Sequence, residues 1–172
     1  MKIEDLRALQ APLKELYRRS PHKAKVTQKA TGRLNPGLLS VEFETPAGPL
    51  TAGLHPATGG DGSQACSGDL LLQSLAACAG VTLQAVAASM RINLHGGMVH
   101  AEGDMDFRGT LAVDKSVPVG FEAIRLSFEL ACDASPGQRE TLLKLTERYC
   151  VVFQTLQSAP PVSTRIEIVA SA

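Results

Sequence analysis

Residues 67–91 read SGDLLLQSLAACAGVTLQAVAASMR, and no charged side chain interrupts this stretch between Asp69 and Arg91. The stretch is too long for a strand and consists mainly of good helix formers, so we expect one helix. Ser67 is the expected N-cap, and Asp69 in the first turn favours the helix dipole. Apolar side chains fall on more than one face at helical spacing, which predicts burial on nearly every side. Cys78 lies in the middle of this helix.

The same stretch is long enough to cross a bilayer, so a membrane span has to be weighed against a buried helix. The stretch is rich in alanine and contains the polar residues Gln73, Ser74 and Gln84. It has no aromatic belt, and one acid and one arginine flank it rather than a basic cluster. Strand-like segments follow it. The pattern therefore favours a central helix inside a folded domain, and we expect no membrane partner.

Length and composition limit the classes of protein that fit. The chain has 172 residues, which suits one domain with its own core. Its 17 basic and 17 acidic residues give no net charge, so nothing indicates nucleic acid or anionic lipid as a partner. The start, MKIEDLRALQ, lacks the apolar core of a signal peptide, which favours the cytoplasm. We expect a single domain over residues 1–172, with an amphipathic helix in 1–20 and a core in 25–169.

The other segments predict an α+β fold with largely antiparallel sheet, because hairpin-linked strands alternate with a few helices. The segment Lys2–Arg19 places leucines on a narrow helical stripe, and Pro12 within it predicts a kink or a break. A capping-box pattern at Ser135–Gln138 opens a helix that reaches Cys150. The expected strands are 25–32, 39–44, 50–54, 99–108, 124–130 and 162–168, and a short helical segment is expected at 151–157.

Neither the cysteines nor the histidines show the spacing of a metal site, and no CxxC pair is present, so we expect no bound metal. The cysteines are Cys66, Cys78, Cys132 and Cys150, and the histidines are His22, His55, His95 and His100. Cys66 and Cys132 are interpreted as incidental or structural residues.

Cys78 and Cys150 both stand in helical settings, and two interpretations are open. Both can be packed core residues, since free cysteine is among the most buried residue types. Alternatively they form a reactive pair, in which one thiolate is oxidised to a sulfenic acid and the other closes a disulfide. That chemistry needs a cation or hydrogen-bond donors near the attacking sulfur. Arg33 and Arg148 are candidate cations, although each taken singly reads as an ordinary surface arginine.

Two motifs resemble those of the OsmC/Ohr family. The pattern D-L-L-L-x-S-L-A-A-C at 69–78, followed by Thr82-Leu83, is similar to its first cysteine motif. The pattern Y-C-V-V-x-x-T-L at 149–156, followed by Pro161-Val162, is similar to its second. Gly120-Phe121-x-x-Ile124 and the order of the strands also match, so the resemblance covers roughly residues 25–169.

The resemblance implies an intertwined homodimer, with largely antiparallel sheets wrapped around long buried central helices and each active site built from both subunits. It also implies thiol-dependent reduction of organic hydroperoxides without metal, haem or flavin. Carried over by position, Cys78 would be the peroxidatic cysteine and Cys150 the resolving cysteine. Turnover would then need an external dithiol, which in the family can be a lipoyl group.

Two positions depart from the family pattern, and the match at a third position is an arginine near the N-terminus. Gly68 stands where the best-characterised peroxidases have a glutamate, so Asp69 either replaces that acid or only stabilises the helix start. Arg33 is the best match for the arginine that stabilises the thiolate, and Val151 stands where a proline usually follows the second cysteine. Two functions therefore stay open: an organic hydroperoxide reductase, or an OsmC-like redox-sensing or apolar-ligand-binding protein with weak or no peroxidase turnover.

Overall fold

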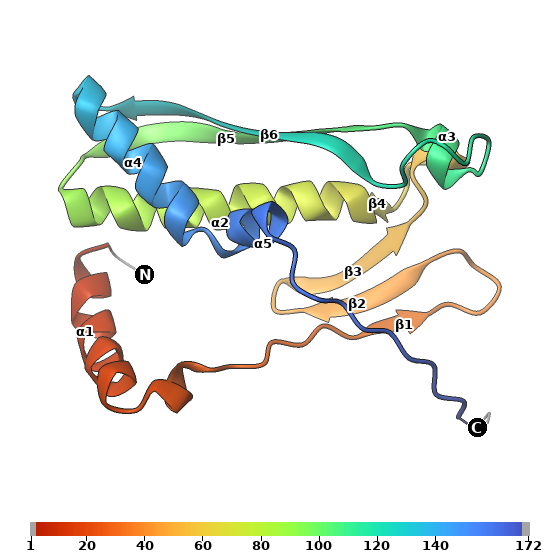
Figure 1. The fold of residues 1–172 in the computed structure, drawn as a ribbon, viewed down its shortest axis with the longest axis horizontal. Coiled ribbons are helices and arrows are strands. Elements are labelled where there is room, and N and C mark those ends of the chain that lie inside the picture. The colour runs from red at the N-terminus through yellow and green to blue at the C-terminus, as the bar shows by residue number, and fades with distance from the viewer. Residues whose placement is uncertain (1–2, 170–172) are drawn as a thin grey trace.

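The computed structural model describes residues 3–169, and the long helix α2 (Ser67–Met90) runs through its middle (Figure 1). The predicted helix is confirmed over its whole length, but its N-cap is Cys66 rather than Ser67. At its other end Arg91 adopts a left-handed conformation with φ 57°. The N–H of Ile92 then bonds back to the carbonyl of Ala87, which closes the last turn.

The first sheet has the order β1-β2-β3-β4 and lies on one side of α2 in Figure 1. The pairs β1/β2 and β2/β3 are antiparallel, with Phe43 opposite Leu50, whereas β4 pairs in parallel with β3. The sheet brings the chain directly into α2, since β4 ends where α2 begins. Its strands are β1 (Gly32–Leu34), β2 (Val41–Thr45), β3 (Gly48–Gly53) and β4 (Ala65–Cys66), and the short 3-10 helices η1 (Pro21–Ala24) and η2 (Pro56–Thr58) lie outside it.

The second sheet is a long antiparallel hairpin of β5 (Leu94–Met105) and β6 (Phe121–Cys132), which covers the opposite side of α2 (Figure 1). Val99 lies opposite Phe128, and the alternation predicted from the sequence sets which face meets α2. The register shifts near one end, where Asp104 pairs with Ala123 and Met105 with Phe121. Glu122 is therefore an extra, bulged residue. A short helix α3 (Phe107–Thr110) lies between the two strands.

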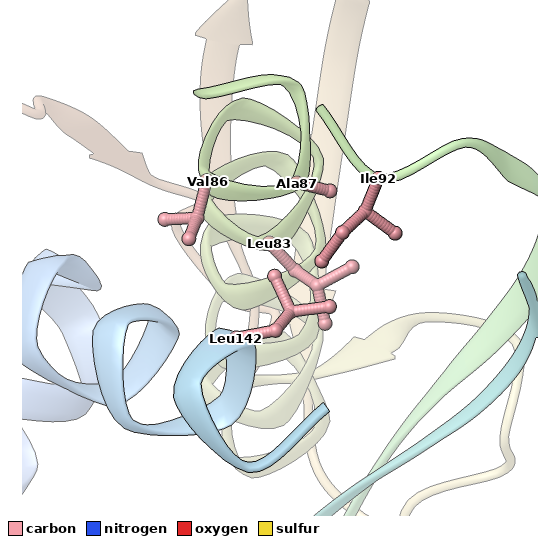
Figure 2. Close-up of a cluster of buried hydrophobic side chains, with 5 residues drawn as sticks. All are labelled: Leu83, Val86, Ala87, Ile92 and Leu142. Atoms are coloured by element: carbon pink, nitrogen blue, oxygen red, sulfur yellow. The ribbon is translucent and has the colours of Figure 1, made fainter. Parts of the chain in front are cut away.

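Helices α4 (Pro136–Tyr149) and α5 (Val151–Gln157) pack against α2 from a third direction. The predicted capping box is present, because Ser135 accepts from the N–H of Gln138 and the Gln138 side chain accepts from the N–H of Ser135. Leu142 of α4 is 1% exposed and contacts the main core, drawn in Figure 2. That core consists of Leu83, Val86, Ala87, Ile92 and Leu142.

Burial of α2 on nearly every side is not achieved within one chain. The buried residues follow one broad stripe, and Val81 on another face is 69% exposed. By length and composition α2 could span a membrane, a test that core helices of folded proteins also pass, and 28% of its most apolar window is buried. The reason is geometric: the hairpin and the pair α4/α5 cover only part of its circumference. The buried residues of α2 are Leu75, Ala79, Leu83, Val86 and Ala87.

Three other predictions are corrected. Of the predicted kink or break at Pro12, the break is wrong, because helix α1 (Ile3–Arg19) continues through this residue. Lys2, where the predicted helix begins, lies outside the described residues. The first strand is shorter and later than predicted, at Gly32–Leu34. Residues 162–168 form no strand, because no described segment of the chain pairs with them, and Ile166 is 89% exposed. The α+β fold class itself is confirmed.

Candidate active site

The two cysteines of the sequence motifs meet where α5 packs against α2. Cys78 lies in the middle of α2 and is partly buried, while Cys150 is the single residue between α4 and α5 and is fully buried. Both are free thiols. The thiol of Cys150 acts as a hydrogen-bond donor toward Cys78, so residues 72 positions apart in the chain form one pair. The tertiary packing of α2 against α5 is what brings them together.

The surroundings of Cys78 favour its thiolate. Burial by itself raises the pKa of the Cys78 thiol, but hydrogen bonds outweigh this and hold the pKa below its usual value. The donors are, in order of effect, the backbone N–H of Val152, the Cys150 thiol, the backbone N–H of Val151 and the Thr82 hydroxyl. All four are uncharged groups. Cys78 is thus stabilised as an anion by oriented dipoles rather than by a cation.

The start of α5 explains two of these donors. The first backbone N–H groups of a helix have no partner within the helix. In α5, the first backbone hydrogen bond runs from the N–H of Gln154 to the carbonyl of Cys150. The N–H groups of Val151 and Val152 are therefore free to meet the sulfur of Cys78. A proline at position 151 would have no N–H to offer. The valine that departs from the family pattern thus adds a donor to the site.

The pKa of Cys150 is shifted in the opposite direction, above its usual value. Burial raises the pKa of the Cys150 thiol, and its position beside Cys78 raises it further, since it donates to the neighbouring sulfur and would repel a second negative charge. The pair therefore loses its first proton from Cys78. This asymmetry separates an attacking thiolate from a thiol that stays protonated until later.

The other predicted site residues lie apart from the pair. Arg33 is exposed on β1, opposite Glu42, and contributes nothing to the groups that lower the pKa of Cys78. Arg148 stands over the ring of Tyr149, 5.6 Å from its centre. Asp69 is in the first turn of α2, about 13 Å from Cys78 along the helix axis at the usual rise. Within one chain, neither a cation nor an acid reaches the sulfur among the described residues.

Gly68 and Asp69 line a different cavity at the start of α2, with a volume of about 340 Å³. A side chain at position 68 would meet only ordinary contacts, since an added Cβ would lie 3.5 Å from the ring of Phe121 and 3.7 Å from the Cys66 sulfur. The glycine is therefore not required for packing. Cys66 lines the same cavity, as does His55, which stacks on Phe107 at 4.9 Å.

A cavity of about 530 Å³ lies between α2, β6 and α5, and most of the side chains that line it are apolar. Leu75 and Leu71 line it from the helical face that also carries Cys78, and Phe153 lines it from the first turn of α5. Leu75 is less than one turn from Cys78, about 4.5 Å along the helix axis. Neither cysteine lines the cavity itself, but Leu75 places one of its walls within a helical turn of Cys78. Its volume falls within the usual range for small-molecule sites.

Sequence reasoning identified the cysteine pair but missed most of what surrounds it. The two backbone donors and the Thr82 hydroxyl were not predicted, although Thr82 stands one helical turn after Cys78, where an i, i+4 contact is expected. The backbone donors carry no signal in residue type. No group of three or more histidine, cysteine or acidic side chains that could hold a metal occurs within residues 3–169.

The chain was compared with known proteins. A family model described as OsmC, OsmC-like protein, matches residues 60–165. A search of curated proteins gave no match.

Solved structures share the fold. An OsmC-like protein from Mycoplasma pneumoniae superimposes with a TM-score of 0.65 at 18% identity, covering 78% of this chain and 90% of that chain. An OsmC-like protein of unknown function from Vibrio cholerae superimposes with a TM-score of 0.59 at 11% identity, covering 75% of this chain and 94% of that chain.

An organic hydroperoxide resistance protein OsmC from Legionella pneumophila gives a TM-score of 0.54 at 17% identity, covering 78% of this chain and 93% of that chain. At these identities the likeness establishes the fold and leaves the activity open. Because the family model matches more than half of the chain and these structures share its architecture, the chain belongs to the OsmC-like protein family.

Proposed function

We propose that this protein is a thiol-dependent peroxidase that reduces organic hydroperoxides through Cys78 and Cys150. The observation that carries the proposal is the asymmetric pair: hydrogen bonds favour the thiolate of Cys78, whereas burial keeps Cys150 protonated beside it. A peroxidase of this kind needs one nucleophilic sulfur and one sulfur within reach of it. Family membership, with a neighbour named for organic hydroperoxide resistance, supports the same assignment.

The reaction balances with an external dithiol as the only further reactant. The Cys78 thiolate attacks the terminal peroxide oxygen, and the O–O bond breaks. The sulfur keeps the hydroxyl group as a sulfenic acid, and the alkoxide leaves as the alcohol after taking from water the proton that the Cys78 thiol had released. The resulting sulfenic acid is attacked by the sulfur of Cys150, which forms a disulfide and releases water. An external dithiol, such as a lipoyl group, then reduces the disulfide and becomes oxidised itself.

The cavity beside the pair supports an alkyl peroxide over hydrogen peroxide as substrate. Its walls are mainly leucine, isoleucine and phenylalanine side chains, which bind an alkyl or aryl group by burying apolar surface. The same walls offer little to hydrogen peroxide, which has no apolar part. We therefore expect selectivity for organic hydroperoxides.

We also propose that the working form is a homodimer. Several large apolar side chains stay exposed in one chain, among them Val81 of α2, Leu39 before β2 and Ile166 near the C-terminus. The hairpin β5/β6 has two long strands and no third strand among the described residues, so the outer edges of both strands keep unpaired backbone groups. A second copy would cover these surfaces at the same time.

A second function, redox sensing or apolar-ligand binding with weak turnover, is favoured by one specific observation. Neither an arginine nor an acid reaches Cys78 within the described chain, so the charge network implied for efficient peroxidases is missing. A thiol with neutral donors alone can be oxidised slowly and reversibly, as a sensor requires.

Stopped-flow kinetics separate the two functions. Wild type, Cys78→Ser and Cys150→Ser are mixed with cumene hydroperoxide or hydrogen peroxide, with a lipoyl dithiol as reductant. The peroxidase proposal requires fast, selective turnover of cumene hydroperoxide that Cys78→Ser abolishes. Cys150→Ser should keep the first oxidation but accumulate the sulfenic acid, which dimedone traps. Slow or Cys78-independent turnover would instead support the second function.

A further inference from the structure

The cavity beside the cysteine pair has a direction along α2. An added Cβ at Gly103 of β5 would lie 3.4 Å from Leu72, and one at Gly80 of α2 would lie 3.2 Å from Val99, so β5 runs opposite to α2. Through the pairing of β5 with β6, Ile124 lies near Leu72, whereas Phe128 lies near Gly80. The later part of β6 is therefore level with Cys78.

The start of β6 marks the far end of the cavity. The Phe121 ring lies 3.5 Å from an added Cβ at Gly68, which is about 15 Å from Cys78 along the axis of α2. Glu122 follows Phe121 and lines the cavity. Among the described residues that line this cavity, Glu122 alone carries a charge. A substrate with its peroxide at Cys78 and its tail in the cavity thus points the end of its tail toward Glu122.

The bulge in β6 affects Glu122, an exposed residue that lines this cavity. Glu122 has no residue opposite it in the hairpin, and such an extra residue re-aims its side chain relative to the alternating pattern. Arg108 lies near enough for the charge of Glu122 to raise its pKa, but Asp106 has a larger effect on it and holds its guanidinium, with Nη2 and Oδ2 2.5 Å apart. Because Arg108 is paired with Asp106, it leaves the charge of Glu122 without a direct ion-pair partner among the described residues.

We infer that Glu122 is a specificity-determining residue that excludes hydroperoxides ending in a carboxylate and admits those ending in a neutral or cationic group. The inference rests on the proposed function, because it concerns the substrate of the same thiol pair. Two carboxylates a few ångströms apart repel each other even when water screens them. A short peroxide such as cumene hydroperoxide does not reach Glu122 and is unaffected by its charge.

The test compares linoleic acid hydroperoxide with its methyl ester, which differ only in the charge at the end of the tail. At low salt the wild type should favour the ester by about fivefold in kcat/KM, and added salt should reduce this preference. Glu122→Gln should bring the ratio close to one, and Glu122→Lys should reverse it. The rate with cumene hydroperoxide is measured for each variant as the reference, and the comparison uses only the ester-to-acid ratio within one variant.

Glu129→Gln is the matched control, because it removes the same charge from another exposed position of the same strand, which lies beside His100 and does not line the cavity. An ester-to-acid ratio that Glu122→Gln leaves unchanged, or that Glu129→Gln shifts equally, would overturn the inference while leaving the peroxidase intact. Loss of turnover with every peroxide would instead reject the proposed function. In that case the role of Glu122 is still tested by how well decanoate and methyl decanoate protect Cys78 from iodoacetamide. Stronger protection by the ester in wild type, and equal protection by both in Glu122→Gln, would support the inference. Equal protection by both in wild type would overturn it.

Discussion

Four uncharged donors surround the sulfur of Cys78, and two of them are backbone N–H groups at the start of α5. Side-chain substitutions elsewhere leave such donors in place, but the residue type at position 151 decides whether one of them exists. Valine supplies an N–H there and proline would not. The departure from the family pattern that seemed to weaken the site in the sequence is thus a gain of one hydrogen bond in the structure.

Val151→Pro tests this donor without changing the backbone. Proline is favoured at the first position of a helix, and Cys150 before it already has extended angles, φ −75° and ψ 111°. Losing one hydrogen bond to the thiolate should slow Cys78 alkylation about tenfold at neutral pH. Because the hydrogen bonds hold the pKa of Cys78 below its usual value, the rise of the alkylation rate with pH should move to higher pH in the variant.

Iodoacetamide labelling, read at Cys78 by mass spectrometry across a pH series, measures both changes. Val151→Ala is the matched control, since it trims the side chain and keeps the N–H. Equal pH profiles for Val151→Pro and Val151→Ala would show that the valine N–H contributes nothing to the thiolate.

At the scale of elements, the end of α2 shows how a local conformation fixes part of the core. Arg91 takes φ 57° and ψ 36°, which allows the next residue to turn back and bond to Ala87. Ile92 is then only 6% exposed and packs into the cluster of Figure 2. The turn therefore recruits a core residue as well as ending the helix.

Arg91→Gly should raise the free energy of unfolding by about 1 kcal/mol, because only glycine adopts the left-handed conformation without steric cost. Chemical denaturation of the reduced protein measures it. Ser89→Gly, two residues earlier and in right-handed helix, is the control and should lower stability by about 0.5 kcal/mol. A destabilised Arg91→Gly variant would mean that the arginine side chain matters more than its backbone angle.

For the whole molecule, the exposed apolar surface of a single chain is the main physical problem. Helix α2 is uncharged over most of its length, yet its face around Val81 is open. Each Å² of apolar surface that a partner covers stabilises the complex by roughly 25 cal/mol. A second copy that packs on this face would give α2 the burial that its sequence predicts.

Val81→Asp should therefore weaken self-association at least about tenfold, since a carboxylate would have to be buried in an apolar contact. Light scattering coupled to size-exclusion chromatography over a concentration series measures the dimer fraction. Ser127→Asp, an exposed position on β6, is the control for an added charge. A wild type that stays monomeric at all concentrations, or a Val81→Asp variant that dimerises as well as wild type, would contradict the proposed dimer.

The elements that could be predicted from sequence are those whose signal is local. Periodicity gave the central helix and the two long strands of the hairpin, the capping box gave the start of α4, and two cysteine motifs gave the family. Such signals depend on residues a few positions apart, which contact each other in any compact fold of the chain. The predicted strand at 162–168 failed because a strand exists only when a partner pairs with it, and one chain supplies none among its described residues.

The sequence by itself determined that Cys78 and Cys150 are the candidate site residues, and it determined the α+β class. Only the tertiary structure decided that α5 points its free N–H groups at Cys78 and that Arg33 and Asp69 lie away from the cysteine pair. It also decided that Glu122 lies at the far end of the cavity. The physical reason is that these facts depend on how α2, α5 and the bulged hairpin pack together. Backbone donors and bulges carry almost no signature in residue type, so packing alone can place them.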